Sequence, residues 1–200
     1  IMTAAAAMSK VGASLVHIHV YADGSAGEAD TSASWAFCVL EEWEMHEYNE
    51  GTGITASSFF VFKGYQTGLV QVNKGQRGYV GASKHSPGHA EASAMIWAML
   101  WCLQGCFPQH AFVTIYYDCC FVGECVSGKG GWDDPSALPV VLRSLGQLLE
   151  VQLGSVRSRG SAVWQHVKGH SGHPWNECAD AIAKTARSKG LVRMQVATAL

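Results

Sequence analysis

Apolar and polar residues alternate near the start of the chain, where the segment 16–23 reads VHIHVYAD. This period of two predicts a β-strand with one apolar face, and the strand ends in a carboxylate, Asp23, before a Gly-Ser pair. Trp, Phe and Val alternate with small residues over 32–40, which predicts a second strand. With a turn of small residues at 24–30 between them, the two segments predict an antiparallel hairpin.

The pattern is weaker between residues 41 and 82. Glutamates at five of the ten positions 41–50 interrupt it, and we expect them to form a solvated loop or sheet edge that faces away from any nucleic acid. Apolar runs at 59–62, 67–72 and 78–82 predict extended chain whose register the sequence leaves open. The first half of the chain is therefore predicted to be rich in β-structure.

A helix that is apolar on all sides is predicted from Ser86 to Gln104. Ser86 suits the N-cap position and Pro87 the first helical position. Glu91 is the only ionisable residue after the opening turn, and a carboxylate buried beside such a helix needs a cation or a hydrogen-bond donor. The alternative is that Glu91 only stabilises the positive end of the helix dipole.

Strands and helices alternate in the second half. The pattern predicts a strand at 111–117 that ends in Asp118, a short helix from Cys119, a loop at 128–134, a helix from Pro135 to Glu150 and a strand at 161–167. A strand–helix–strand order favours a parallel crossover beside the first strand. Neighbouring strands lie about 5 Å apart, so Asp23 and Asp118 would be close enough to share a cation.

The segment after the last strand is the most specific in the chain. Pro174 suits the start and Gly190 the end of a C-terminal helix. Asn176 and Asp180 stand four residues apart and therefore share one face of that helix. His170 lies in a glycine-flanked loop before it, and a mobile imidazole beside a carboxylate suits proton transfer.

Two other interpretations of the histidines stay open. His170 can be a structural histidine, which is the usual role of a single imidazole. A zinc site is the second interpretation, although its spacing matches no compact metal-binding pattern. Its ligands would be His166, His170, His173 and Cys178.

Length and composition limit what such residues can belong to. The 200 residues, 48% of them hydrophobic, are typical of one globular domain. Seven cysteines without a paired framework indicate a reducing intracellular compartment, the nucleus or the cytoplasm. No uncharged apolar run is long enough for a membrane span, and an initial Ile in place of Met suggests a fragment of a longer protein.

Charge is distributed unevenly along the chain. Residues 1–150 carry 7 basic and 14 acidic side chains, whereas residues 151–200 carry 7 basic and 2 acidic ones. The C-terminal end is therefore the expected anion-facing end, with Lys168 and Lys184 as candidate phosphate contacts. A solvated basic face is the alternative.

Four motifs resemble, in order and spacing, those of type 1 ribonuclease H. They are YADGS at 21–25, AEA at 90–92, YD at 117–118 and VKGHSGHPWNECAD at 167–180. The resemblance covers roughly residues 15–190, with a flexible extension at 1–14 and a tail at 191–200. It implies an α/β fold with a central mixed five-stranded sheet flanked by helices, in which strands 1 to 3 are antiparallel and strands 4 and 5 run parallel to the first.

The resemblance also implies a function. Asp23, Glu91, Asp118 and Asp180 would hold two Mg²⁺ ions, with Mn²⁺ as a substitute, and His170 would assist proton movement. The substrate would be an RNA–DNA hybrid whose RNA strand is hydrolysed. Its contacts would include Gly24, Ser25 and Asn176.

Within that family, residues 86–104 and the long strand region before them are most similar to the ribonuclease H domains of non-LTR retrotransposon reverse transcriptases. A covalently linked reverse transcriptase domain would then be a partner, and no membrane would be involved. Such a tether would raise the effective concentration of substrate at the domain.

The sequence departs from the family pattern in ways that affect substrate binding. Many members have Asn before the glutamate, where this chain has Pro87-Gly88-His89, and Ser after the third acid, where it has Cys119. The basic protrusion of some cellular members is reduced here to Lys129 and Trp132, which predicts weak hybrid binding. A catalytically silent binding or scaffolding module, or a resolvase or exonuclease of the same fold, are the alternatives.

Overall fold

The computed structural model describes residues 12–28, 31–49, 53–105, 107–128, 138–160 and 162–192. In these ranges the strands are β1 (Ala13–Ala26), β2 (Ala33–Asn49), β3 (Gly53–Leu69), β4 (Phe112–Tyr117) and β5 (Val163–His166). The helices are α2 (Pro87–Leu103), α3 (Cys120–Ser127), α4 (Val140–Val156) and α5 (Pro174–Lys189). The predicted extension at 1–14 and tail at 191–200 fall mostly outside the described residues, and β1 begins at Ala13.

The strands form one mixed sheet in the order β3-β2-β1-β4-β5. β1 pairs with β2, and β2 with β3, in antiparallel fashion, whereas β4 runs parallel to β1 and β5 parallel to β4. The predicted architecture is confirmed. β1 is the central strand, so its C-terminal end lies between the C-terminal end of β4 and the N-terminal end of β2.

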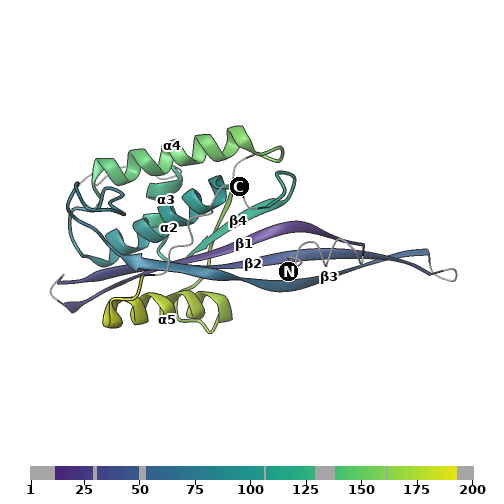
Figure 1. The fold of residues 1–200 in the computed structure, drawn as a ribbon, viewed down its shortest axis with the longest axis horizontal. Helices are drawn as coiled ribbons and strands as arrows, with labels where there is room; N and C mark the ends of the chain where they lie inside the picture. The colour runs from purple at the N-terminus through teal and green to yellow at the C-terminus, as the bar shows by residue number, and fades with distance from the viewer. Residues whose placement is uncertain are drawn as a thin grey trace.

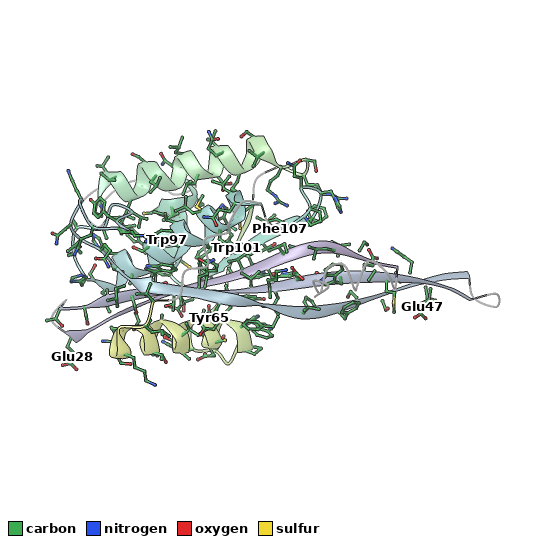
Figure 2. All side chains as sticks on the ribbon, viewed as in Figure 1. Glu28, Glu47, Tyr65, Trp97, Trp101 and Phe107 are labelled. Carbon is green, nitrogen blue, oxygen red and sulfur yellow. The ribbon has the colours of Figure 1, made fainter. Side chains whose placement is uncertain are left out.

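Helices cover both faces of the sheet (Figure 1). The helices α2, α3 and α4 lie on one side, with α4 outermost, and α5 lies on the other. Ile18 and Val20 are fully buried under α2, as the alternating pattern predicts. Figure 2 shows Trp97 and Trp101 of α2, with Phe107, on that side of the sheet, and the rings of Trp101 and Phe107 stack 5.4 Å apart.

Small residues allow α5 to pack closely on the opposite face. Ala179, Ala183 and Ala186 are fully buried at the contact with β1 and β2. The Ser34 hydroxyl donates a hydrogen bond to the Ala183 carbonyl oxygen over 2.6 Å, which ties the helix to β2. These small side chains therefore form the contact surface of α5.

The glutamate-rich segment is not a solvated loop. It forms the second half of β2, which lies between β1 and β3. Glu41 is only 3% exposed, and its carboxylate accepts a hydrogen bond from Trp43 Nε1 and pairs with Lys63 Nζ at 2.7 Å. Charge compensation from a neighbouring strand explains how a carboxylate is accommodated inside the sheet.

Other predicted boundaries also need correction. Gly24 and Ser25 do not form a turn, because β1 continues to Ala26 in register with β2. The piece predicted at 59–62 and the first part of the piece predicted at 67–72 belong to a single strand, β3, which ends at Leu69. The register shift between Val39 and Leu40 of β2 skips Lys63 of β3. Residues 78–82 are not in a strand.

Helix α4 starts and ends later than predicted. Pro139 is its N-cap residue, and the helix continues past Glu150 to Val156 because Leu153 is fully buried. Residues 129–137, including Lys129 and Trp132, lie outside the described residues. No helix in the described ranges is long and apolar enough to cross a membrane, and the six cysteines described are free thiols.

Candidate active site

Two aspartates lie at the C-terminal ends of adjacent parallel strands. Tyr21 of β1 is in register with Tyr116 of β4, and Asp23 and Asp118 each follow two residues later. Because the strands are parallel, both carboxylates reach the same edge of the sheet. Asp23 is only 4% exposed. The prediction that these two acids lie together is confirmed by this register.

Glu91 reaches the same place from α2. The Gly24 backbone N–H donates a hydrogen bond to Glu91 Oε2 over 3.1 Å. A Cβ atom at Gly24 would collide with the backbone of Ala90 and Glu91, so glycine allows β1 and α2 to approach each other. The first turn of α2 contains no acidic residue, so the helix-dipole alternative for Glu91 is not supported.

These three carboxylates form a compact cluster. Asp23, Glu91 and Asp118 each offer an oxygen within 4.8 Å of the others, and Asp23 and Glu91 share a hydrogen bond. Burial, with Asp118 and Asp180 nearby, raises the pKa of Asp23 from 3.8 to about 7. Burial and the charges of Asp23 and Asp118 raise the pKa of Glu91 well above its usual range. Mutually repelling carboxylates, which offer hard oxygen ligands, are a fitting donor set for Mg²⁺.

Asp180 joins the site from α5, on the opposite face of the sheet. It is 9% exposed, and its charge contributes to the raised pKa of Asp23. Its Oδ2 accepts a hydrogen bond from Lys184 Nζ at 2.6 Å, one turn further along α5. This ammonium group places a positive charge beside the carboxylates. A cation is therefore expected to stabilise this part of the site, as it is for the cluster of three acids.

Asn176 connects α5 to β4. Its amide Nδ2 donates a hydrogen bond to Asp118 Oδ2 over 3.2 Å, and the residue is 2% exposed. Its Oδ1 is buried and has no hydrogen-bond partner among the residues that the structure describes. Asn176 therefore orients the Asp118 carboxylate and keeps one acceptor atom available at the site.

His170 lies beside Asp180 in an exposed loop. It is the only non-glycine residue with positive φ among those described, at +50°, a conformation that tightens the loop before α5. Its ring nitrogen lies within 4.8 Å of the carboxylates of Asp180 and Glu177. A Cβ atom at the preceding Gly169 would lie 2.8 Å from Asp118 Oδ2, so this loop also touches the first cluster.

Glu177 is the residue that the sequence analysis missed. Its side chain accepts a hydrogen bond from the Gly172 N–H over 3.4 Å and faces His170. Its position in the sequence could have identified it. Glu177 stands three residues before Asp180, and this spacing places both carboxylates on one face of a helix.

The predicted zinc set is not brought together. His166 Nε2 donates a hydrogen bond to the Asp118 carbonyl oxygen, and Cys178 Sγ lies 3.5 Å from Cys38 Sγ. The His173 ring contacts the Tyr21 ring in a tilted arrangement, at 5.0 Å between ring centroids. These contacts point in different directions, so His166, His170, His173 and Cys178 do not form one site.

The remaining predicted substrate contacts differ in accessibility. Ser25 is 7% exposed, and the Gly24 N–H is already bonded to Glu91. Lys168 is exposed in the loop before α5, and the Lys184 side chain is 54% exposed beside Asp180. The two lysines therefore border the carboxylates on their solvent side.

Solved structures share this architecture. A ribonuclease H1 isolated from compost superposes with a TM-score of 0.51 at 16% identity, over 87% of this chain and 97% of the other. The N-terminal RNase H domain of a Mycobacterium tuberculosis protein gives a TM-score of 0.50 at 16% identity, over 86% of this chain and 93% of the other. The fold is therefore the ribonuclease H fold.

Sequence comparison identifies the family. The RNase H family model matches residues 16–188, and this chain belongs to that family. The ribonuclease H of Ruegeria sp. is 36% identical over 78 residues, 36% of this chain and 47% of the relative. That of Pseudomonas savastanoi is 46% identical over 55 residues, 28% of this chain and 34% of the relative. The chain thus spans about half or less of the length of the curated relatives it matches.

Proposed function

We propose that this chain hydrolyses the RNA strand of RNA–DNA hybrids. The observation that carries the proposal is the cluster of Asp23, Glu91 and Asp118, whose oxygens lie within 4.8 Å of one another. Asp180 lies outside this group of three but close enough for its charge to raise the pKa of Asp23, so it is the fourth acid of the candidate site. Such a set is stabilised by divalent cations and has no evident structural purpose without them.

The four carboxylates would hold two Mg²⁺ ions, with Mn²⁺ as a substitute. When bound, the ions supply an activated water and charge stabilisation for the departing 3′-oxygen. Asp23 and Asp118 fix the position of the site because they extend from the ends of paired strands. Asn176 holds the Asp118 carboxylate in one orientation. His170, in its exposed loop beside Asp180, moves a proton at the reacting or leaving oxygen.

Selection of RNA would come from contacts to its 2′-hydroxyl groups. The Asn176 Oδ1 atom is buried at the site without a partner and can accept a hydrogen bond from a hydroxyl group. The backbone at Gly24 and Ser25 borders the same edge of the sheet. Lys168 and Lys184 supply positive charge for the phosphates on the solvent side.

The chain would act as the ribonuclease H part of a non-LTR retrotransposon polyprotein, tethered to a reverse transcriptase domain. The apolar helix α2 and the long strands β2 and β3 support this assignment, because they carry the resemblance to that subgroup. Attaching a polymerase domain should lower the KM for hybrid without changing kcat, since a tether acts on effective concentration. An unchanged KM in the fused protein would argue against the tethered role.

A substrate panel tests the activity itself. Hybrid, duplex DNA and duplex RNA are incubated with the chain in Mg²⁺, beside the Asp118→Asn variant. We expect cleavage of the RNA strand in the hybrid alone, and none by the variant. Cleavage of duplex DNA by the wild-type chain would indicate a different nuclease of this fold. No cleavage of any substrate, in Mg²⁺ or Mn²⁺, would indicate a silent binding module.

A further inference from the structure

A second group of ligand-type side chains lies on the sheet, away from the carboxylates. His17 and His19 stand two apart on β1, so both point to one face, and His17 is in register with Glu42 of β2. This is the face that carries α5, and the strands continue past the N-terminal end of that helix (Figure 1). Four residues of strand separate His19 from Asp23, roughly 13 Å at 3.3 Å per residue.

The three side chains converge on one carboxylate oxygen. Glu42 Oε2 lies 3.0 Å from His19 Nε2 and 3.8 Å from His17 Nδ1. Two ligand atoms that each sit about 2.0–2.1 Å from a tetrahedral Zn²⁺ ion are roughly 3.3 Å apart. The observed separations bracket that value, so small side-chain movements would close the set around one ion.

The opposite nitrogen of each imidazole is already engaged. His17 Nε2 hydrogen-bonds with Thr114 Oγ1 over 2.8 Å, and His19 Nδ1 with the Tyr116 hydroxyl over 3.0 Å. Both partners come from β4, the neighbouring strand. Such outer hydrogen bonds fix the tautomer and orientation of histidines that bind metals. They leave His17 Nδ1 and His19 Nε2 as the nitrogens that face Glu42.

We propose that His17, His19 and Glu42 form a Zn²⁺ site that is separate from the catalytic carboxylates. Two imidazoles and one carboxylate match the nitrogen and oxygen ligands of zinc sites that keep one position for water. A set with two imidazoles also favours Zn²⁺ over Mg²⁺, which prefers oxygen ligands only. The ion would link β1 to β2, with β4 supplying the outer hydrogen bonds.

Access and surroundings suit such an ion. The side chains of His17, His19 and Glu42 are 25%, 11% and 23% exposed, so a water molecule can reach the fourth position. Phe60 and Phe112 contact the two imidazoles from either side, at 5.6 Å and 5.8 Å between ring centroids. Both rings are themselves exposed, at 58% and 44%, so they border the triad and leave it open to solvent.

Metal binding requires one rearrangement. The rings of His17 and His19 are stacked, with centroids 4.1 Å apart and planes inclined by 22°. An ion must lie near the plane of each ring, so the two planes must tilt toward each other by a limited rotation about the Cβ–Cγ bonds that keeps the hydrogen bonds to Thr114 and Tyr116. That torsion is broad in histidine, and the rotation is therefore inexpensive.

Titration with Co²⁺ and then Zn²⁺ tests the site. The background is the Asp23→Asn, Asp118→Asn chain, in which the competing carboxylate cluster is weakened. We expect one equivalent of Co²⁺ to give the visible absorption of a four-coordinate ion, and one equivalent of Zn²⁺ to displace it. His17→Gln and His19→Gln should each weaken Co²⁺ binding at least tenfold.

A matched control distinguishes the triad from an ordinary surface pair. His46 Nε2 lies 3.7 Å from Glu44 Oε2 on β2, at 52% and 36% side-chain exposure, with no second imidazole. His46→Gln should leave the spectrum and affinity unchanged. Loss of the spectrum in His46→Gln, or no absorption by the parent chain at stoichiometric Co²⁺, would overturn the proposal.

Thr114→Val covers the case in which a histidine variant fails to fold. This change keeps the volume of a residue that is 3% exposed and removes the hydroxyl group that holds His17. The expected result is binding weaker by about tenfold or more, which is typical of lost outer-sphere hydrogen bonds. Unchanged Co²⁺ affinity in Thr114→Val would show that the ion lies elsewhere.

Discussion

Asp23 shows how one residue links the fold to the chemistry. It is buried near the end of the central strand, where water cannot stabilise its charge, and the charges of Asp118 and Asp180 lie close by. The pKa of its carboxyl group is about 7 for these reasons. The fold therefore carries an unfavourable charge arrangement that divalent cations relieve, and we expect metal to act on stability as well as on activity.

Stability without metal should depend on pH in a defined direction. The pKa of Asp23 is about 7 when folded and near 3.8 when unfolded, so the folded chain binds the extra proton between these values. The contribution of this proton to the free energy of unfolding is complete below pH 4 and is lost as the pH rises through 7. In EDTA, the Tm of the wild-type chain should therefore fall between pH 5 and pH 8.

Asp23→Asn should flatten that profile and abolish cleavage, because the amide carries no charge to relieve. Mg²⁺ should restore the wild-type Tm at pH 8 but have little effect on the variant. Glu47→Gln, a change at an exposed acid on the far end of β2 (Figure 2), is the control and should keep the wild-type profile. If the Tm of Asp23→Asn still fell steeply with pH, the Asp23 carboxyl group would not be the cause of the pH dependence.

Kinetic tests should distinguish the role of His170 from that of the carboxylates. It is exposed and lies beside Asp180. If it moves protons, His170→Ala should lower kcat by about 10²-fold or less and leave the Mg²⁺ affinity nearly unchanged. The exposed His110 provides a matched substitution that should have no effect. Wild-type kcat in His170→Ala would mean that the imidazole only shapes the loop.

Among the elements, the contact between β1 and α2 decides the geometry of the site. A Cβ atom at Gly24 would meet the backbone of Ala90 and Glu91, which cannot move without shifting the helix. Gly24→Ala should therefore destabilise the chain by about 1–3 kcal/mol and displace Glu91 from the cluster. Urea unfolding and cleavage assays measure the two effects.

Gly75→Ala is the appropriate control for that change. No atom lies within 4 Å of a Cβ atom at Gly75, and the residue lies outside the regular elements. Stability and activity should stay at the wild-type level or rise slightly, since alanine restricts the unfolded chain. Equal losses in the two variants would show that the Gly24 contact is not the cause.

Sequence patterns predicted the elements that carry the acids but not all of their boundaries. The end of β4 could be recognised because an apolar run stops at a carboxylate, and α5 because Pro174 and Gly190 delimit it, whereas β1 continues past Asp23 to Ala26. The second half of β2 could not, because Glu41 looks solvent-exposed until Lys63 on another strand neutralises it. Tertiary partners distant in sequence overrode the local composition there.

The same limit applies to the site. The order of strands and helices predicted that Asp23 and Asp118 are neighbours, which the parallel register bears out. Glu177 and the triad around Glu42 depend on which side chains meet across a loop or between strands. That information is absent from spacing alone, and only the packed structure supplies it.

At the scale of the whole molecule, the basic side chains and one acid of the candidate site lie on the same loop and helix. The loop from Lys168 and the helix α5 carry Asp180 together with Lys184, Arg187 and Lys189. The acidic end of β2 projects from the other end of the sheet, where Figure 2 shows Glu47. A hybrid whose scissile phosphate reaches the carboxylates must therefore pass the lysines and not the glutamates.

The salt dependence of hybrid binding tests this orientation. Each phosphate contact releases counterions and contributes roughly 0.9 to the slope of log affinity against log salt on B-form DNA. Replacing Lys168 and Lys184 by Gln should weaken binding for every base sequence and reduce the slope by about one to two units. Glu44→Gln and Glu47→Gln together should leave the slope unchanged, because their positions lie away from the bound phosphates. A slope that responds to the glutamates and not to the lysines would place the hybrid across the opposite end of the sheet, where the imidazole–carboxylate triad lies.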